Sequence, residues 1–321
     1  MARYYTGMST PAVAAASPLV AAPAPAPAPD GAAAAVPDEL VARLAAAVAA
    51  GGVTVLTGAG VSTDSGIPDY RSPGKPPPRP MQHLDFVRHP LARARYWARS
   101  ATGWPRLRAA TPGPAHHALA RLERAGLISA VITQNVDGLH QRGGGREVLE
   151  LHGALRDVVC LGCREVTSRD EVQARLLADN PALATRVAAG GSVLAAAGDR
   201  PDGDVELEPG ADDLAALRVP ACLGCGGVLK PDVVFFGDNV PRPRVELARA
   251  WVEAARLLLV VGSSLTVFSG YRFVRHADDR AVPVAIVNRG PTRADGATRL
   301  RIDAGCGPVL AALAATVGAA P

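Results

Sequence analysis

The chain has 321 residues, of which 48% are hydrophobic and 4% aromatic, and its formal net charge is +4 at pH 7. That length allows two domains and a sizeable core built mainly from Val, Leu, Ile and Ala. The weak positive charge, without a basic stripe that carries interleaved aromatic residues, argues against a nucleic-acid partner. No run approaches the roughly 20 apolar residues that a membrane helix needs, so we expect no membrane partner.

The first 36 residues are rich in Ala and Pro. Alternating Pro removes amide donors and favours an extended chain, so we predict that residues 1–36 form a disordered tail. The tract lacks the charged segment and the uninterrupted apolar run of a secretory signal. We therefore expect a cytoplasmic protein.

From residue 37 onward, helical patterns alternate with apolar runs. Helices are predicted at 37–52, 90–110, 114–126, 245–256 and 306–318. Strands are predicted at 53–57, 127–134, 257–264 and 282–288, and a Pro-rich loop at 72–80. Strands that are apolar on both faces and alternate with helices predict an α/β fold, a Rossmann-like parallel sheet with helices on both faces.

The middle of the chain breaks this rhythm and contains two Cys-x-x-C pairs. The pairs are Cys160 with Cys163 and Cys222 with Cys225, and Cys306 is left over. In a reducing compartment such pairs favour metal binding over disulfides, although a redox-active pair is the alternative. Four thiolates would close the tetrahedral shell of Zn²⁺, which indicates a structural rather than a hydrolytic metal.

The Cys pairs divide the folded chain into two domains. We predict that 37–153 and 231–318 form the Rossmann-like domain, with a small helical excursion at about 72–112. The segment 154–230 would be a small zinc-binding domain inserted into the larger one. Helices and loops between the two pairs would allow the pairs to meet.

Polar or Gly-rich residues follow the ends of four predicted strands. They are Gly58-Ala59-Gly60, Gln134-Asn135-Val136-Asp137, Gly262-Ser263-Ser264 and Asn288. The carboxyl ends of parallel strands share one edge of a sheet, where ligands bind. Gly58 and Gly60 would let a phosphate approach backbone amides, and a helix starting at about 61–66 would present its positive end. A purely structural glycine turn is the alternative.

Longer motifs carry a resemblance to a known family. In chain order they are GAGVSTDSGIPDYRS, TQNVDGLH, ELHG, the two Cys-x-x-C pairs, KPDVVFFGD, GSSL and IVNRGPT. Together they resemble the sirtuins, NAD-dependent protein lysine deacylases, over about residues 37–315. The stretches MQHLDFVR, RYWAR, GWP and PDGDVEL are similar to class II-like bacterial members. The resemblance implies NAD as a consumed co-substrate, zinc as a structural metal, and acylated lysine side chains of proteins as substrates.

The resemblance also implies which residues bind NAD. The Gly58-Ala59-Gly60 loop would hold the diphosphate, and a flexible loop would end at Asp69-Tyr70-Arg71 near the ribose and nicotinamide. Asn135 and Asp137 would grip the nicotinamide carboxamide, and the backbone of Cys306 would contact adenine. The full set is Gly58, Ala59, Gly60, Asp69, Tyr70, Arg71, Gln134, Asn135, Asp137, Gly262, Ser263, Ser264, Asn288 and Cys306.

His152 matches the catalytic base of the family, and Asn135 is its predicted catalytic partner. An imidazole that titrates near neutrality suits the removal of a proton from a ribose hydroxyl. The other histidines are expected to be structural or on the surface. In the implied reaction nicotinamide is released and the acyl group ends on 2′-O-acyl-ADP-ribose. A protein mono-ADP-ribosyltransferase and a non-catalytic NAD-binding scaffold are the alternatives.

The segment DVVFFGD, 232–238, would receive the substrate peptide as an added strand, facing the loop after Gly262-Ser263-Ser264. A plain core strand is the alternative. The predicted substrate residues are Val234, Phe235, Phe236, Gly237 and Val267. A Tyr-x-x-Arg pair, which desuccinylating sirtuins use for acidic acyl chains, is absent from the loop after Arg71. We therefore expect acetyl or another short neutral acyl group; the sequence predicts no oligomeric state.

Overall fold

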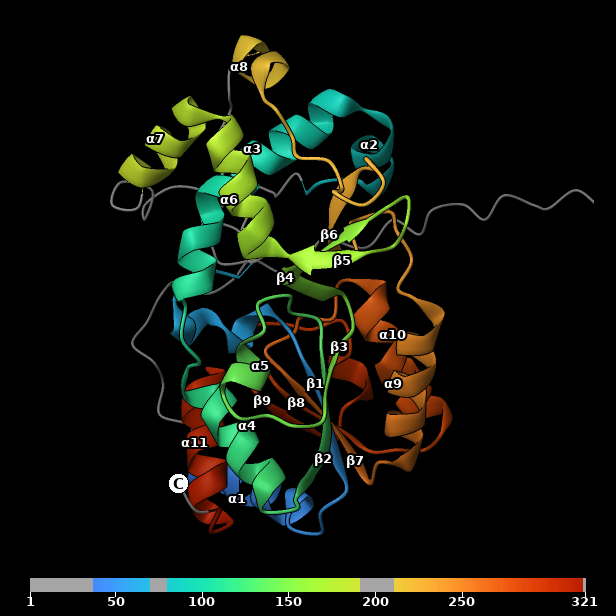
Figure 1. Ribbon diagram of the computed structural model, residues 1–321. Coiled ribbons are helices and arrows are strands. Elements are labelled where there is room, and N and C mark those ends of the chain that lie inside the picture. The colour runs from blue at the N-terminus through green and yellow to red at the C-terminus, as the bar shows by residue number, and fades with distance from the viewer. Residues whose placement is uncertain (1–36, 70–79, 191–210, 320–321) are drawn as a thin grey trace, which may run out of the picture.

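The computed structural model describes residues 37–69, 80–190 and 211–319, which fold into two parts stacked one above the other in Figure 1. The lower part is built on a six-stranded sheet of order β3-β2-β1-β7-β8-β9, in which all neighbours are parallel. Its strands are β1 (Val53–Thr57), β2 (Ile128–Thr133), β3 (Val148–Glu150), β7 (Leu257–Val261), β8 (Val284–Val287) and β9 (Leu300–Ile302). The chain winds outward from β1 on one side and from β7 on the other, so the strand order reverses between them.

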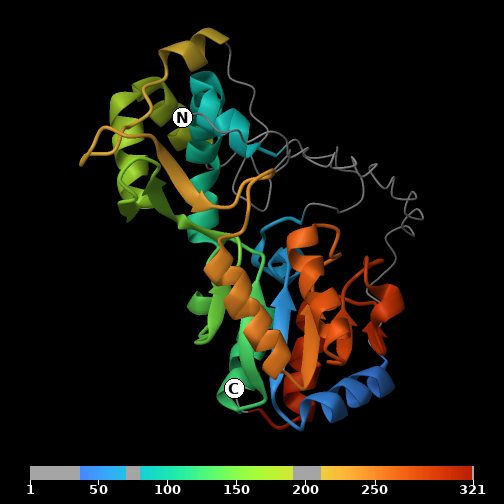
Figure 2. The same cartoon turned by 90° about the vertical axis from the view of Figure 1, so that its right-hand side faces the viewer.

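Helices cover both faces of this sheet, as Figures 1 and 2 show. They are α1 (Asp38–Val48), α4 (Pro114–Arg124) and α11 (Cys306–Thr316) on one face, and α9 (Arg242–Ala254) and α10 (Phe268–Asp279) on the other. The central strands β1 and β7 are buried at every position because apolar side chains pack on both of their faces. The predicted Rossmann-like sheet is confirmed.

The upper part contains a three-stranded antiparallel sheet of order β5-β4-β6. Its strands are β4 (Gly153–Cys160), β5 (Val166–Ser168) and β6 (Leu229–Val233). Its helices are α2 (His83–Arg88), α3 (Pro90–Ala109), α6 (Arg169–Asp179), α7 (Pro181–Gly190) and α8 (Ala211–Ala216). One hydrophobic cluster joins Phe86 and Trp97 of the first two helices to Val158 and Leu229 of the sheet. We propose that 83–109 and the described parts of the inserted segment, 154–190 and 211–230, form one small domain with a shared core.

Several predicted elements differ from the structure. The helix expected at 61–66 is absent, and two short 3₁₀ turns, Ala59–Val61 and Thr63–Ser65, occupy this stretch. The helix α10 and the short strand β9 were not predicted. Strands β2, β7 and β8 end before the polar residues that follow them, because those residues leave the sheet. The predicted tail 1–36 and most of the Pro-rich loop 72–80 lie outside the described residues.

A short helix, α5 (Leu139–Arg142), follows β2 and begins directly after the predicted cofactor residues. No helix in the described ranges has both the length and the apolar character needed to cross a membrane.

The two sheets meet where β3 is followed, after two residues, by β4. The predicted catalytic base therefore lies between the large sheet and the small one.

Arg169, the first residue of α6, is fully buried between two tryptophans of α3. Its guanidinium carbon lies 5.2 Å from the ring centroids of both Trp97 and Trp104. Its Nη2 donates a hydrogen bond to Ser100 Oγ at 3.3 Å. Burial lowers the pKa of Arg169 to about 10, so the side chain is still a cation at pH 7. Cation–π contacts therefore tie the inserted segment to α3.

We expect Arg169→Ala to lower the free energy of unfolding by about 2–4 kcal/mol, because it removes both cation–π contacts and leaves a cavity. Arg169→Met should lose less, since it refills part of the volume without a buried charge. Urea unfolding followed by tryptophan fluorescence measures both variants. Arg88→Ala, at an exposed position of α2, should change the stability by no more than about 0.5 kcal/mol. Equal stability of the Arg169→Ala protein and the wild type would contradict the assignment.

Candidate active site

The loops after β1 and β7 pack directly on one another at the carboxyl edge of the large sheet. Gly58 N donates to Val261 O at 3.1 Å, and Gly60 N donates to Gly262 O at 2.9 Å. A Cβ atom on Gly58 would lie 2.8 Å from Gly262 O and Ser263 Cβ, and one on Gly60 would lie 2.9 Å from Gly262 Cα. The glycines are thus required by the contact between the two loops. The N–H groups of both glycines donate to backbone oxygens, and the binding of a phosphate at this loop stays a prediction.

Asn135 and Asp137, both predicted site residues, lie together with Ser62 beside this loop. Ser62 Oγ donates to Asp137 Oδ2 at 2.7 Å, and Leu139 N donates to Asp137 Oδ1 at 2.9 Å. Asn135 Nδ2 donates to Gly58 O and to Ser62 Oγ, both at 3.1 Å. Burial raises the pKa of Asp137. Sequence reading missed Ser62, although it lies within the motif that suggested the site.

Gln134 connects the ends of three strands. Its Nε2 donates to Ser263 Oγ at 2.9 Å, beyond β7, and to Thr57 O at 3.1 Å, at the end of β1. Ser263 Oγ also accepts a hydrogen bond from Leu265 N at 3.2 Å. These contacts fix the loops after β1, β2 and β7 relative to one another. Gln134, Asn135, Asp137 and Ser263 are brought to the common edge that the strand pattern predicted.

His152 lies at the junction between the two parts, after β3 and before β4. Its Nδ1 is 2.9 Å from Gln134 O, and its Nε2 is 2.8 Å from Ser269 Oγ. A carbonyl oxygen can only accept, so Nδ1 carries the proton and Nε2 has the lone pair. This is the tautomer in which Nε2 can remove a proton from a hydroxyl group.

The charge state of His152 follows from its surroundings. Burial lowers its pKa to about 4, and the positive charges of Arg272 and Arg244 act in the same direction. The hydrogen bond to Gln134 O acts in the opposite direction but does not offset the burial. The imidazole is therefore neutral at pH 7 and able to accept a proton, but its pKa lies below the near-neutral value expected from the sequence because the ring is buried.

A backbone hydrogen bond joins the predicted substrate segment to His152. Val234 N donates to His152 O at 2.9 Å. Phe235 is buried and points into the small-domain core, whereas Phe236 is 41% exposed and Val267, across the junction, is 37% exposed. Phe236 O accepts from His83 N at 2.9 Å, so one edge of the segment is already paired with the start of α2.

The remaining predicted cofactor residues are spread along the same edge. Asn288 Nδ2 donates to Arg289 O and Gly290 O, at 2.9 and 3.0 Å, and so stabilises the turn after β8. Cys306 begins α11, and burial raises the pKa of its thiol to about 12. Ser264 Oγ lies 3.1 Å from Thr266 Oγ1. Tyr70 and Arg71 lie outside the described residues, whereas their neighbour Asp69 is described.

The four paired cysteines converge in the small domain. Their sulfur atoms lie within 4.8 Å of one another, with Cys160 Sγ 3.5 Å from Cys225 Sγ and Cys163 Sγ 3.7 Å from Cys222 Sγ. Zn–S bonds of about 2.3 Å in a tetrahedron would place the sulfurs about 3.8 Å apart, whereas a disulfide needs about 2.05 Å. The donor set and its spacing thus fit one structural zinc ion.

The two Cys-x-x-C turns have the same backbone arrangement. In one, Arg164 N donates to Cys160 O at 3.0 Å; in the other, Gly226 N donates to Cys222 O at 2.9 Å. Arg164 and Gly226 both have a positive φ, of 66° and 73°. Such paired turns present two sulfurs each toward a common point, which a redox-active pair does not need.

The model of the Sir2 family matches residues 58–269 of this chain. The chain belongs to the Sir2 family. A relative from Monosiga brevicollis, named NAD-dependent protein deacylase SIR4, is 53% identical over 76% of this chain and 77% of its own length. NAD-dependent protein deacetylase 1 of Mycobacterium avium (strain 104) is 48% identical over 85% of this chain and 94% of its own length. A solved Sir2 structure with a p53 peptide and NAD⁺ has a TM-score of 0.63 and 30% identity, covering 84% of this chain and 94% of that one.

This Sir2 protein has a Tyr-x-x-Arg spacing outside the loop in which the sequence analysis looked for it. The Tyr-x-x-Arg spacing is absent from the loop after Arg71, but it occurs in α3 as Tyr96 and Arg99. Both residues are buried, and the Tyr96 ring centroid lies 5.2 Å from that of Phe235, next to the predicted substrate segment. The loop sequence is therefore no basis for excluding acidic acyl chains from this Sir2 protein.

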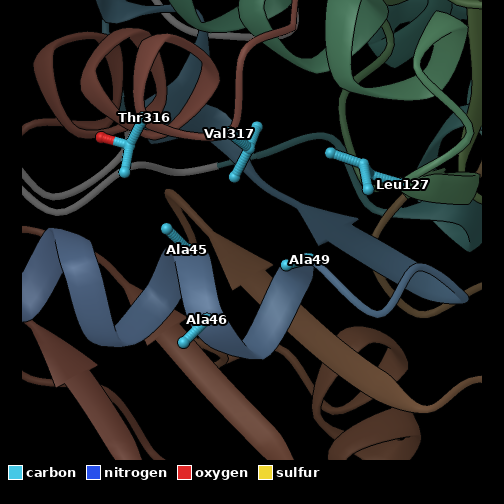
Figure 3. A pocket seen from close by; sticks show the side chains of 6 residues that line it. All are labelled: Ala45, Ala46, Ala49, Leu127, Thr316 and Val317. Carbon is cyan, nitrogen blue, oxygen red and sulfur yellow. The ribbon is translucent and has the colours of Figure 1, made fainter.

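Figure 3 shows an apolar depression of this Sir2 chain. It has a volume of about 300 Å³ and lies between the ends of α1 and α11, lined by Ala45, Ala46, Ala49, Leu127, Thr316 and Val317. Leu127 precedes β2, so this depression is at the amino ends of the strands. It contains no titratable side chain and offers no chemistry to the Sir2 reaction.

We expect Cys222→Ser to reduce the zinc content of the purified Sir2 protein strongly and to lower its thermal stability, because three thiolates hold the ion less well than four. Metal analysis by mass spectrometry and a thermal melt measure the two effects. Cys306→Ser, which changes a thiol outside the cluster, should keep the full zinc content. Unchanged zinc in the Cys222→Ser protein would contradict the four-sulfur site.

Two further histidines are buried behind β1. His140 Nε2 lies 2.9 Å from Thr57 Oγ1, and the ring centroids of His116 and His140 are 4.8 Å apart. Burial lowers the pKa of His116 to about 4 and that of His140 to about 3, from a usual value of 6.5. Both are neutral in the folded protein at pH 7. The unfolded chain binds these protons first, so acid favours unfolding.

The free energy of unfolding should therefore fall as the pH is lowered from 6.5 toward 4, by up to about 1.4 kcal/mol per pH unit for each buried neutral histidine. His140→Gln should make this dependence less steep between pH 6.5 and 5.5, whatever its stability at pH 7. His89→Gln, at an exposed position, should leave the slope unchanged. Urea unfolding at several pH values gives the slopes, and identical slopes in His140→Gln and wild type would be the contrary result.

Proposed function

We propose that this protein is an NAD-dependent protein lysine deacylase in which His152 is the general base. The family membership and the names of the two relatives support the reaction class. The substrates would be acylated lysine side chains of proteins, in line with the peptide and NAD⁺ in the solved relative. The acyl group would leave as 2′-O-acyl-ADP-ribose, with nicotinamide and free lysine as the other products.

A single observation carries this proposal. His152 belongs to both halves of the site. Its ring carries the Nε2 lone pair of the base, and its backbone oxygen accepts a hydrogen bond from Val234 N of the substrate segment at 2.9 Å. A peptide that pairs with the segment beyond Val234 would be held at a fixed distance from the base. Backbone pairing demands little of the peptide sequence, which suits an enzyme that acts on many proteins.

The residues at the sheet edge fit NAD as the co-substrate. Bound NAD would supply a ribose carbon whose cationic nicotinamide group is ready to leave. Asn135 donates its amide N–H to Gly58 O, and within the described residues no hydrogen bond reaches its Oδ1. We assign this oxygen and the Asp137 carboxyl group to the nicotinamide carboxamide. The loop at Gly58-Ala59-Gly60, with Ser263 and Ser264, would receive the diphosphate.

The zinc ion would have a structural role. Four cysteine ligands leave no open position for water or substrate, so the ion would take no part in acyl transfer. It would instead hold the two Cys-x-x-C turns together at the far end of β4 and β6. Strand β4 begins next to His152 and strand β6 ends next to Val234, so zinc loss would loosen the substrate segment.

Two other functions make different predictions. A mono-ADP-ribosyltransferase would use the same NAD site but leave the ADP-ribose on a protein. An NAD-binding scaffold would bind NAD without releasing nicotinamide. The neutral His152, whose Nε2 carries a lone pair, favours the deacylase over the scaffold, because a scaffold needs no base. The cytoplasmic location expected from the sequence stays a prediction.

A peptide panel measured by mass spectrometry tests the function. Peptides that carry acetyl, propionyl, butyryl, succinyl or longer acyl-lysine should lose one or more of these groups only when NAD is present, with matching acyl-ADP-ribose. His152→Ala should still bind NAD but turn over about 10²–10⁴ times more slowly, because it removes the base. His89→Gln is the matched control and should turn over normally.

Other results would overturn the proposal in distinct ways. Label transferred from NAD to protein, without acyl loss, would favour the ADP-ribosyltransferase. NAD binding without nicotinamide release would favour the scaffold. Normal turnover of His152→Ala would leave the reaction class intact but remove His152 as the base.

A further inference from the structure

Ser269 makes a direct contact with the lone pair of the proposed base. Its Oγ lies 2.8 Å from His152 Nε2, although 117 residues separate the two in the chain. Since Nδ1 carries the imidazole proton, Nε2 can only accept, and the Ser269 hydroxyl is the donor. None of the sequence motifs that predicted the site includes Ser269.

The position of Ser269 is fixed by the fold. It is the second residue of α10, a helix of 12 residues whose buried side includes Phe273 and Val274. The next residue, Gly270, lies against Gln134, because a Cβ atom there would be 2.3 Å from Gln134 Oε1. Gln134 also provides the carbonyl oxygen that accepts from His152 Nδ1. The imidazole is thus held from both sides, by a backbone carbonyl and by a helix that packs on the same glutamine.

The charged groups around His152 do not provide this orientation. Arg272 of α10 and Arg244 of α9 lower its pKa through their positive charge. Arg244 is partly balanced by Asp232 of β6, with Nη2 to Oδ2 at 3.3 Å. Neither arginine makes a hydrogen bond to the imidazole in the described part of the chain. Ser269 is therefore the side chain that fixes the direction of the Nε2 lone pair.

We propose that Ser269 is a positioning residue, whose hydroxyl holds His152 in the orientation in which Nε2 accepts the proton from the ribose hydroxyl. This inference rests on the proposed function. When that hydroxyl approaches, the Ser269 hydroxyl can rotate and release the lone pair, since a serine O–H turns freely about its C–O bond. No covalent bond to Ser269 is involved.

The inference predicts an effect on one step of the reaction. Nicotinamide release comes before the step that needs a base, so it should not depend on Ser269. Acyl transfer to the ribose hydroxyl should depend on it. A purely structural role would instead slow both steps together, because a disturbed fold would weaken binding of NAD and peptide.

We expect Ser269→Ala to lower kcat for deacylation about 5–10-fold, the effect of losing one hydrogen bond, while exchange of labelled nicotinamide into NAD stays within about twofold of wild type. Ser269→Thr, which keeps the hydroxyl, should restore most of the deacylation. Thr316→Ala, which removes an exposed hydroxyl of α11, is the control and should leave both rates unchanged. Thermal melts of all variants report on folding.

A second measurement does not need turnover. In ¹⁵N-labelled protein, the Nε2 resonance of His152 should shift in Ser269→Ala, because a nitrogen that loses a hydrogen-bond donor changes its chemical shift. An unchanged Nε2 resonance would overturn the inference even if the protein were no deacylase. Equal loss of deacylation and nicotinamide exchange, or no loss of either, would also overturn it. Absence of deacylation in the wild type, with the expected shift, would instead count against the proposed function alone.

Discussion

The structure depends on one close approach between two backbones, at Gly153. This glycine has a φ of 83°, and a Cβ atom there would lie 1.9 Å from Asp232 O, so no other residue fits without moving the chain. Gly153 begins β4 and pairs with Val233 at the end of β6. The two chain segments that connect the large sheet with the small one are therefore in backbone contact at this point. His152 precedes one of these residues and Val234 follows the other, which brings the proposed base and the proposed substrate segment together.

The same constraint explains why the two sheets can act as one site. The large sheet holds Gln134 at the end of β2, and Gln134 O fixes the imidazole of His152. The small sheet carries the segment after Val233 toward the junction. The two sheets contribute different parts of the site. The parallel sheet provides loops that lie together at one edge, and the antiparallel sheet provides an extended segment for a peptide. Zinc would act at a distance by keeping β4 and β6 paired at their other end.

Sequence reading found the parts of the fold that have strong local signals. Strands β7 and β8 are uninterrupted apolar runs, strands β1 and β2 are largely apolar, and the polar residues that follow all four marked the edge of the sheet. The short strand β9, which was not predicted, has only three residues, too few for a periodic pattern. Helix α10 has a weak local signal in the sequence. Gly270, near its start, makes room for Gln134, and Gly lowers helix propensity.

Residues of the candidate site could be proposed from the sequence where a motif is continuous, and they were missed where contacts join distant segments. His152, Asn135 and the four metal-binding cysteines each belong to a short motif. Ser269, by contrast, contacts a residue 117 positions earlier, and Arg169 is held by tryptophans about 70 positions earlier. Such partners depend on the packing of elements, which local sequence does not encode. Gly58 and Gly60 also have a role that the sequence did not show: the close contact with Gly262 leaves no room for a side chain at either position.

The electrostatics of His152 fit a base that must be regenerated at each turnover. Burial and two arginines disfavour the protonated imidazole, so the proposed base would hold a proton from a ribose hydroxyl weakly and lose it again readily. The carbonyl of Gln134 opposes this by stabilising the imidazolium through Nδ1–H, which keeps proton uptake possible. Asp232 reduces the charge of Arg244 without touching the ring. A carboxylate in direct contact would raise the basicity of His152 but would also keep it protonated at pH 7, and Nε2 would then have no lone pair to offer.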